Sequence, residues 1–212
     1  MSYSPPLYPP SSVVPVTRTD ILARIKEWLE DQRNSSSILW LCSLPKAGKS
    51  VSAQTTADLC RANNQLGGTF FFHRGGIEED QTQFLFATLA YQLAYNISGL
   101  LESINRIMCL DPTLPTKSMV TQFQSLIVEA FAQYTPSPTA PIRIIILDRL
   151  DECPNEEPQL EILQIIGRST AELKLPLRYI ITGRPEYHLR EVFKSDLFYE
   201  IIHSIFIDDQ YD

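Results

Sequence analysis

The stretch from Ser36 to Leu59 constrains the fold of this chain more than any other part. It begins with the apolar run Ile38 to Cys42, crosses a short loop and reaches Gly48-Lys49-Ser50, and Val51 to Cys60 then has a helix-compatible pattern. A buried strand, a tight loop and a helix that starts with Gly-Lys-Ser are typical of a nucleotide phosphate site. The reason is physical, because unpaired N–H groups at a helix start and the helix dipole both favour an anion.

Individual residues of this loop carry more specific expectations. Lys49 is expected to reach the β/γ-phosphates, and the Ser50 hydroxyl is expected to bind Mg²⁺. The usual pattern is G-x-x-x-x-G-K-[ST], and here Ser43 stands where the first glycine belongs. Pro45 also removes one N–H donor from the loop. The loop therefore departs from the usual phosphate cradle at its first half, while its second half keeps the pattern.

Composition limits the classes of protein to consider. The chain has 212 residues, of which 44% are hydrophobic, so one domain with one sizeable core is the default. A net charge of −7 argues against binding to nucleic acid or to an anionic membrane. The four cysteines lie far apart and show no metal-site or disulfide spacing, and no apolar run approaches the length of a membrane span. We expect a soluble cytoplasmic protein with reduced thiols.

Strand-like and helix-like segments alternate along the chain. A proline-rich leader over 1–16 is expected to be disordered, a folded domain to cover 17–207, and 208–212 to form a tail. Residues 63–68 read as a turn. The predicted strands are 38–42, 69–73, 142–147, 177–182 and 199–207, and the predicted helices are 17–34, 51–60, 83–97, 100–108, 117–134, 158–173 and 186–193. This alternation predicts an α/β fold whose parallel sheet is covered on both sides.

An acidic motif follows the clearest strand. Ile144 to Leu147 is apolar and leads directly to Asp148, at a strand's carboxyl end, where open α/β sheets bind ligands. In a phosphate-loop protein an acid here holds the Mg²⁺ shell. Asp151 and Glu152 follow within one turn, and such crowding of carboxylates favours a shared cation. The alternative interpretation is a solvated acidic turn after a buried strand.

A third element is Arg184, which follows the strand at 177–182. An arginine at this place can sense the γ-phosphate or stabilise transferring charge. The alternative is a surface arginine that ends a strand before Pro185. Arg74 and Arg18 are weaker candidates for the same role.

Five motifs occur in a familiar order. They are Thr17-Arg18-Thr19, the loop from Leu41 to Ser50, the run Gly68 to Arg74, the segment Ile146-Leu-Asp-Arg-Leu-Asp-Glu-Cys153 and the segment Ile181-Thr-Gly-Arg-Pro-Glu186. Together they resemble the NACHT domain of the STAND class of P-loop NTPases, in the nephrocystin-like version abundant in fungal proteins. The resemblance covers residues 17–207.

This resemblance implies a three-layer P-loop NTPase fold with a five-stranded sheet in the order 5-1-4-3-2. It also implies that Ser50 and Asp148 bind Mg²⁺, that Asp151 or Glu152 orients an attacking water, that Arg184 senses the γ-phosphate and that Arg18 borders the adenine. The residues that it implies for nucleotide contact in the loop are Ser43, Lys46, Ala47, Gly48, Lys49, Ser50 and Val51.

Three functions remain open at this point. The first is an ATP- and Mg²⁺-binding NACHT module with at most slow hydrolysis, used in signalling or self-association with other NACHT-type proteins. The second is a degenerate scaffold for protein contacts, because the family loop usually reads G-x-x-G-x-G-K-S and Ser43 and Lys46 replace its first two glycines. The third is a small-molecule kinase, for which the sequence shows neither an acceptor pocket nor a lid.

Overall fold

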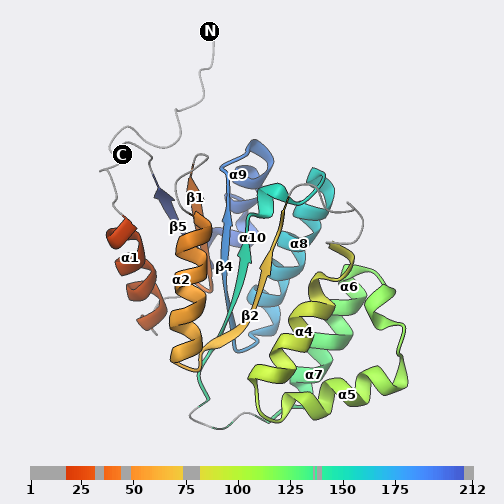
Figure 1. The fold of residues 1–212 in the computed structure, drawn as a ribbon. Helices are drawn as coiled ribbons and strands as arrows, with labels where there is room; N and C mark the ends of the chain where they lie inside the picture. Colours follow the sequence, from red (N-terminus) through yellow and green to blue (C-terminus); the bar gives the residue numbers. More distant parts are fainter. Residues whose placement is uncertain are drawn as a thin grey trace.

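Five parallel strands form one sheet at the centre of the fold, with helices on both sides (Figure 1). Their order is β2-β3-β4-β1-β5, which confirms the predicted fold class and strand order. The strands are β1 (Ile38–Ser43), β2 (Leu66–Phe71), β3 (Arg143–Asp148), β4 (Leu177–Gly183) and β5 (Ile202–Ile207). Strands β1, β3 and β4 consist mostly of buried apolar residues, as expected for parallel strands covered on both faces.

The structure, a computed structural model, describes residues 18–31, 36–43, 49–73, 82–135, 137 and 140–207, and of Arg18, Ser43 and Lys49 the backbone alone. The predicted leader over 1–16 and the tail over 208–212 lie outside these residues, as does the loop 44–48. Among the described helices, none combines the length and hydropathy that crossing a bilayer requires.

Side chains alternate between the two faces of the sheet along each strand. In β1, Leu39 and Leu41 pack against α1 and α2, whereas Ile38 and Trp40 belong to the larger core on the opposite face. Strand β3 divides its apolar residues in the same way. The first face carries α1 (Arg18–Glu30) and α2 (Lys49–Ala62). The larger core on the second face includes α4 (Leu85–Asn96), α5 (Leu100–Leu110), α6 (Met119–Gln122), α7 (Glu129–Ala132), α8 (Glu156–Arg168), α9 (Tyr187–Phe193) and α10 (Asp196–Tyr199).

The second strand begins earlier than predicted. The prediction placed a turn at 63–68, whereas β2 already starts at Leu66 and includes Gly67 and Gly68. A Cβ atom on Gly67 would lie 3.0 Å from Ile145 Cδ1 and 3.2 Å from Leu93 Cδ2. These glycines therefore allow β2 to pack closely against β3 and α4, which is a tertiary requirement and not a turn signal.

The last predicted strand also needs correction at its start. Residues 196–199 form the short helix α10, and β5 starts only at Ile202. Phe198 of α10 is fully buried, and its ring would lie 2.8 Å from a Cβ on Gly167 of α8. Close contact with α8 thus holds this segment as a helix. Helix α8 itself starts at Glu156, and its predicted end, 169–173, is a π-helical turn.

The cysteines provide a direct test of the packing. Cys42, Cys60 and Cys153 are buried and Cys109 is exposed, and all four are free thiols. Burial raises the pKa of Cys60 to about 11 and that of Cys153 to about 12. Because the thiolate is the reactive form, we expect a thiol reagent to modify one cysteine quickly in the native protein and the other three at least about 100-fold more slowly. Cys109→Ser should remove the fast phase, and denaturation should expose all remaining thiols. A second fast thiol in the native protein would contradict this packing.

Candidate functional site

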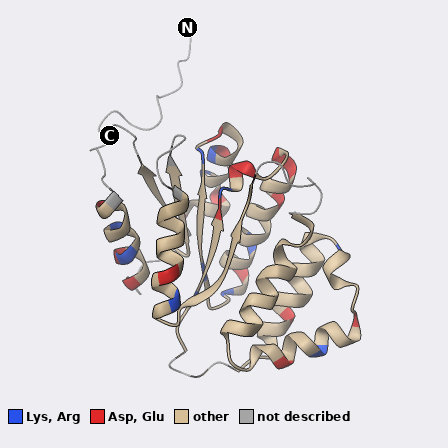
Figure 2. Cartoon of the chain, viewed as in Figure 1, with Lys and Arg blue, Asp and Glu red and all other residues tan. Residues whose placement is uncertain are grey.

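Strand β4 lies between β1 and β3, so the carboxyl ends of these three parallel strands lie side by side at one edge of the sheet. In register, Thr182 of β4 is opposite Leu41 of β1, and Ile181 is opposite Leu147 of β3. Figure 2 shows acidic and basic residues close together at this edge, beyond the ends of β3 and β4. The edge is formed by carboxyl ends of parallel strands, where ligands bind in open α/β sheets.

Asp148, the last residue of β3, is held by the neighbouring strand. Its carboxylate is 1% exposed, and its Oδ1 accepts a hydrogen bond of 2.6 Å from the hydroxyl of Thr182. The same hydroxyl oxygen accepts a hydrogen bond of 2.9 Å from the backbone N–H of Arg149. Thr182 therefore fixes both the acid and the backbone of the residue that follows it.

Arg149 adopts left-handed backbone geometry, with φ 59° and ψ 50°. This conformation costs a non-glycine residue on the order of 1 kcal/mol or more, so the surrounding contacts must hold it. Its Nε donates a 2.7 Å hydrogen bond to Ser50 Oγ, at the start of α2, and lies 3.7 Å from Asp148 Oδ2. Its Nη1 lies 3.5 Å from Glu152 Oε2. The guanidinium thus joins the start of α2 to the end of β3.

The second acid of the motif faces a different arginine. Asp151 lies in the turn η3 (Leu150–Glu152), where the fully buried Leu150 anchors the segment. Its Oδ2 is 3.1 Å from Nε of Arg184, which directly follows β4. Within the described part of the chain, Asp151 Oδ1 is buried and has no hydrogen-bond partner. One oxygen of this carboxylate is therefore paired and the other is available to a further polar group.

The structure brings together most of the predicted residues that it describes. Ser50, Asp148, Asp151, Glu152 and Arg184 all lie at this edge. The three acids do not converge on one point, since two face Arg149 and one faces Arg184; in the described ranges no three metal-binding groups form a cluster. Arg149 and Arg184 therefore compensate the charges of this acidic turn.

The remaining predicted residues are placed less fully. Lys49 is the first residue of α2, and Val51 is 47% exposed on the same helix. Arg18 begins α1 on the same face of the sheet as α2, and Ser43 ends β1. The predicted contacts Lys46, Ala47 and Gly48 lie outside the described residues, as does the weaker candidate Arg74.

Two residues of the site were missed in the sequence. Thr182 had a recognisable signal, because it is a polar residue near the carboxyl end of a buried strand. Arg149 had a weaker one, since an arginine beside an acid commonly belongs to a solvated turn. Its role depends on a positive φ and on a contact with Ser50 that is 99 residues away, and neither can be read from local pattern.

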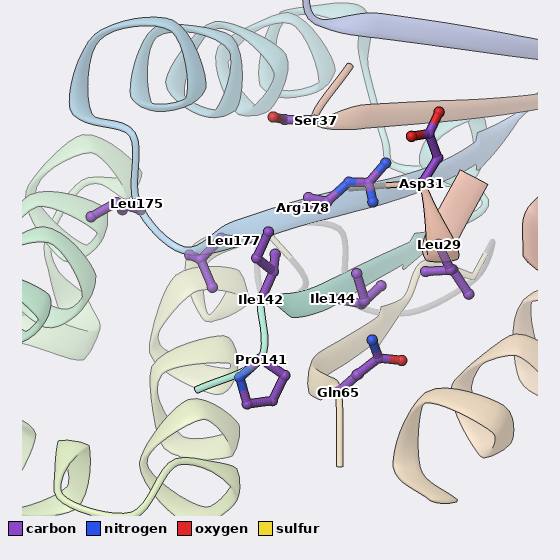
Figure 3. A pocket seen from close by; sticks show the side chains of 10 residues that line it. All are labelled: Leu29, Asp31, Ser37, Gln65, Pro141, Ile142, Ile144, Leu175, Leu177 and Arg178. Carbon is purple, nitrogen blue, oxygen red and sulfur yellow. The ribbon is translucent and has the colours of Figure 1, made fainter. Parts of the chain in front are cut away.

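A cavity of about 180 Å³ lies at the opposite edge of the sheet (Figure 3). Arg178 lines it, stacks 3.6 Å from the centre of the Trp28 ring and donates a 3.2 Å hydrogen bond to the carbonyl of Ser36. Burial lowers the pKa of Arg178 to about 10, so it remains charged at neutral pH. This cavity adjoins the amino ends of the strands, with Ser37, Ile144 and Leu177 in its lining. It is separate from the site at Asp148.

The fold and this edge together define a class. The order β2-β3-β4-β1-β5, with the Gly-Lys-Ser segment after β1 and the acid after β3, is that of a P-loop NTPase domain. The family model described as "Nephrocystin 3, N-terminal" matches residues 17–184, and the chain belongs to this family. The nephrocystin-like resemblance of the sequence is thereby confirmed. Among curated proteins, none matches the chain.

One of two similar solved structures supports the fold. In a Drosophila ORC complex bound to GC-rich DNA and Cdc6, one chain matches with a TM-score of 0.54 and 10% sequence identity over 92% of this chain. A bacterial ABC transporter cassette, solved as a dimer, matches with a TM-score of 0.40 and 14% identity, over 84% of this chain and 83% of the cassette. The present chain spans 29% of the fly chain.

Proposed function

We propose that this chain is a nucleotide-binding module that takes ATP at the carboxyl edge of its sheet, hydrolyses it slowly at most, and uses the bound state in signalling or self-association. Membership of the nephrocystin family and the P-loop NTPase fold support nucleotide binding in general. The base, the rate of hydrolysis and the role in signalling belong to the proposal alone.

One observation carries the proposal. Ser50 at the start of α2 and Asp148 at the end of β3 face the same positively charged nitrogen, Arg149 Nε, at 2.7 and 3.7 Å. These two elements belong to different parts of the chain, and only the fold brings them together. In a P-loop site the corresponding serine and acid hold the cation beside the phosphates. The helix start at Lys49 would supply backbone N–H groups to those phosphates.

The residues present also suit Mg²⁺. A hydroxyl oxygen and a carboxylate oxygen are hard ligands of the kind that Mg²⁺ prefers, and both already face one cationic group. Mg²⁺, when bound, would neutralise charge on the β- and γ-phosphates. Ser50 and Asp148 would hold it, and Thr182 would keep the Asp148 carboxylate oriented through its 2.6 Å hydrogen bond.

The same edge has groups suited to hydrolysis. Asp151 keeps one buried oxygen without a partner among the described residues, so that oxygen can accept a hydrogen bond from an attacking water. Arg184, whose side chain is 35% exposed, pairs with the other oxygen and directly follows β4, the neighbour of β1 in the sheet. Contact with the γ-phosphate would require Arg184 to exchange this ion pair for the phosphate, which is consistent with slow turnover.

Direct binding tests the proposal. Calorimetric titration of the purified chain with ATP, ADP and GTP should give saturable binding of one ATP per chain, and ATP should raise the temperature of unfolding because it binds only the folded state. Absence of both the heat of binding and the thermal shift at millimolar ATP would contradict the proposal.

The scaffold alternative predicts a different pattern. Ser43 and Lys46 replace glycines of the family loop, and a non-glycine residue forced into left-handed geometry loses about tenfold in affinity if that geometry is needed. The double variant Ser43→Gly/Lys46→Gly therefore separates the two readings. If ATP binds only to the restored loop, the natural chain is a scaffold. If both proteins bind ATP, the altered loop is functional.

A further inference from the structure

We propose that Arg149 is a built-in counter-cation of the nucleotide site, so that its guanidinium and a divalent cation compete for Ser50 and Asp148. The part of this inference that concerns nucleotide rests on the proposed function. The part that concerns metal binding does not depend on nucleotide. With Arg149 in this position, nucleotide binding to the natural protein would depend far less on Mg²⁺ than the presence of Ser50 and Asp148 suggests.

The position of the guanidinium carries the argument. Its Nε is 2.7 Å from Ser50 Oγ and 3.7 Å from Asp148 Oδ2, which are the two oxygens expected to hold a metal. A second contact, 3.5 Å from Nη1 to Glu152 Oε2, adds a further acid to the same side chain. An arginine cannot lose its charge in a protein, so a divalent cation at this place would be repelled as long as Arg149 stays there.

The backbone aims the side chain at this position. The N–H of Arg149 is held by Thr182, whose hydroxyl in turn donates to Asp148. These two hydrogen bonds fix a left-handed residue that would otherwise be strained, and they place its side chain beside the very acid that it neutralises. The backbone therefore holds the Cα of Arg149 beside Asp148, and the side-chain rotamer completes the contact with Ser50.

The same side chain can leave. It is 44% exposed, so rotation about its side-chain bonds can carry the guanidinium into solvent without unfolding the turn. A metal that binds must replace a charge-assisted hydrogen bond and two ion pairs, which weakens its apparent affinity by about tenfold or more. A nucleotide that binds without metal finds the positive charge of the Arg149 guanidinium already at the site.

The test begins with the metal alone. We would measure Mn²⁺ binding to the nucleotide-free chain by electron paramagnetic resonance, for the natural protein, Arg149→Ala and Arg149→Gly. The glycine variant adopts a φ of 59° without strain, so it keeps the turn even if the alanine variant does not fold. Arg106→Ala is the matched control, because it removes an arginine that is 59% exposed on α5. We expect the Arg149 variants to bind Mn²⁺ at least about tenfold more tightly than the natural and control proteins.

A second substitution locates the gain. Asp148→Asn in the Arg149→Gly background should abolish the added Mn²⁺ binding, since it removes the carboxylate charge at the same place. Equal Mn²⁺ affinity in the natural protein and the Arg149 variants would overturn the inference, and so would a gain that survives Asp148→Asn.

The nucleotide arm uses calorimetry with ATP in EDTA and in Mg²⁺. The natural protein should bind ATP with affinities that agree within about threefold, whereas Mg²⁺ should tighten binding to Arg149→Gly at least about tenfold. A tenfold effect of Mg²⁺ that is the same in both proteins would contradict the inference. If none of the proteins binds ATP but the Mn²⁺ gain is present, the proposed function fails and the role of Arg149 stands.

Discussion

Lys49→Ala is expected to weaken ATP binding at least about 100-fold, equivalent to about 2.7 kcal/mol, and to leave the fold intact. Lys49 is the first residue of α2, at the positive end of the helix dipole, and in the proposed site its ammonium would bind the β- and γ-phosphates. Alanine keeps the helix propensity and the backbone N–H of this position. The variant therefore removes a charge from the phosphate site and leaves the backbone donors in place.

Calorimetry measures the loss of affinity, and thermal unfolding without nucleotide shows whether the fold is kept. Lys26→Ala is a matched control, because its side chain is 68% exposed on α1 and its only described ion pair is with the equally exposed Glu30. An exposed pair of this kind contributes about 1 kcal/mol at most to stability. Unchanged ATP affinity in Lys49→Ala would remove the phosphate site from the proposal. An equal loss in Lys26→Ala would point to a general effect of charge.

The architecture was predictable because it depends on apolar pattern. Runs such as Ile144 to Leu147 have no polar face, and this is the requirement of a strand covered by helices on both sides. Because successive side chains of a strand point to opposite faces, the position of each residue in β1 then assigns its side chain to one face of the sheet. Strand order came from the family resemblance, since no local pattern specifies that β4 lies between β1 and β3.

The errors arose where tertiary packing overrode a local signal. Gly67 and Gly68 look like a turn, but they are needed because β2 passes close to β3 and α4. Tyr199 was predicted to begin the last strand, but the burial of Phe198 beside Gly167 holds residues 196–199 as a helix. Both cases involve contacts with elements distant in sequence, which composition and periodicity do not report.

The sequence predicted the residue types of the candidate site. It did not predict which acid pairs with which arginine. Three acids in five residues suggested one shared cation, yet the structure separates them between Arg149 and Arg184. The sequence contains both arginines, but which acid each one faces depends on the left-handed turn after β3 and on the position of β4. The charge pattern therefore predicted which side chains lie together, and backbone geometry decided how their charges are compensated.

Asp148→Ala is expected to lower the free energy of unfolding by about 3 kcal/mol, because it breaks a buried network at its centre. The carboxylate is 1% exposed and accepts the 2.6 Å hydrogen bond from Thr182, so its removal leaves that hydroxyl without its acceptor and takes away one of the two acids that face Arg149. Asp148→Asn should cost less, since its amide oxygen can still accept from Thr182. Thr182→Val, which keeps the shape of the strand residue, should cost about 1–3 kcal/mol.

Chemical denaturation of the single variants and of Asp148→Ala/Thr182→Val measures whether the two residues act as one unit. Partners in one hydrogen-bond network show coupling of about 0.5–3 kcal/mol, so the double variant should be less destabilised than the sum of the two singles. Asp58→Asn is the control, because its carboxylate is 60% exposed in an ion pair with Arg61 and contributes about 1 kcal/mol at most. Strict additivity would mean that Thr182 does not hold Asp148. The hydrogen bond from the backbone N–H of Arg149 to the same hydroxyl would then no longer explain the left-handed conformation of Arg149.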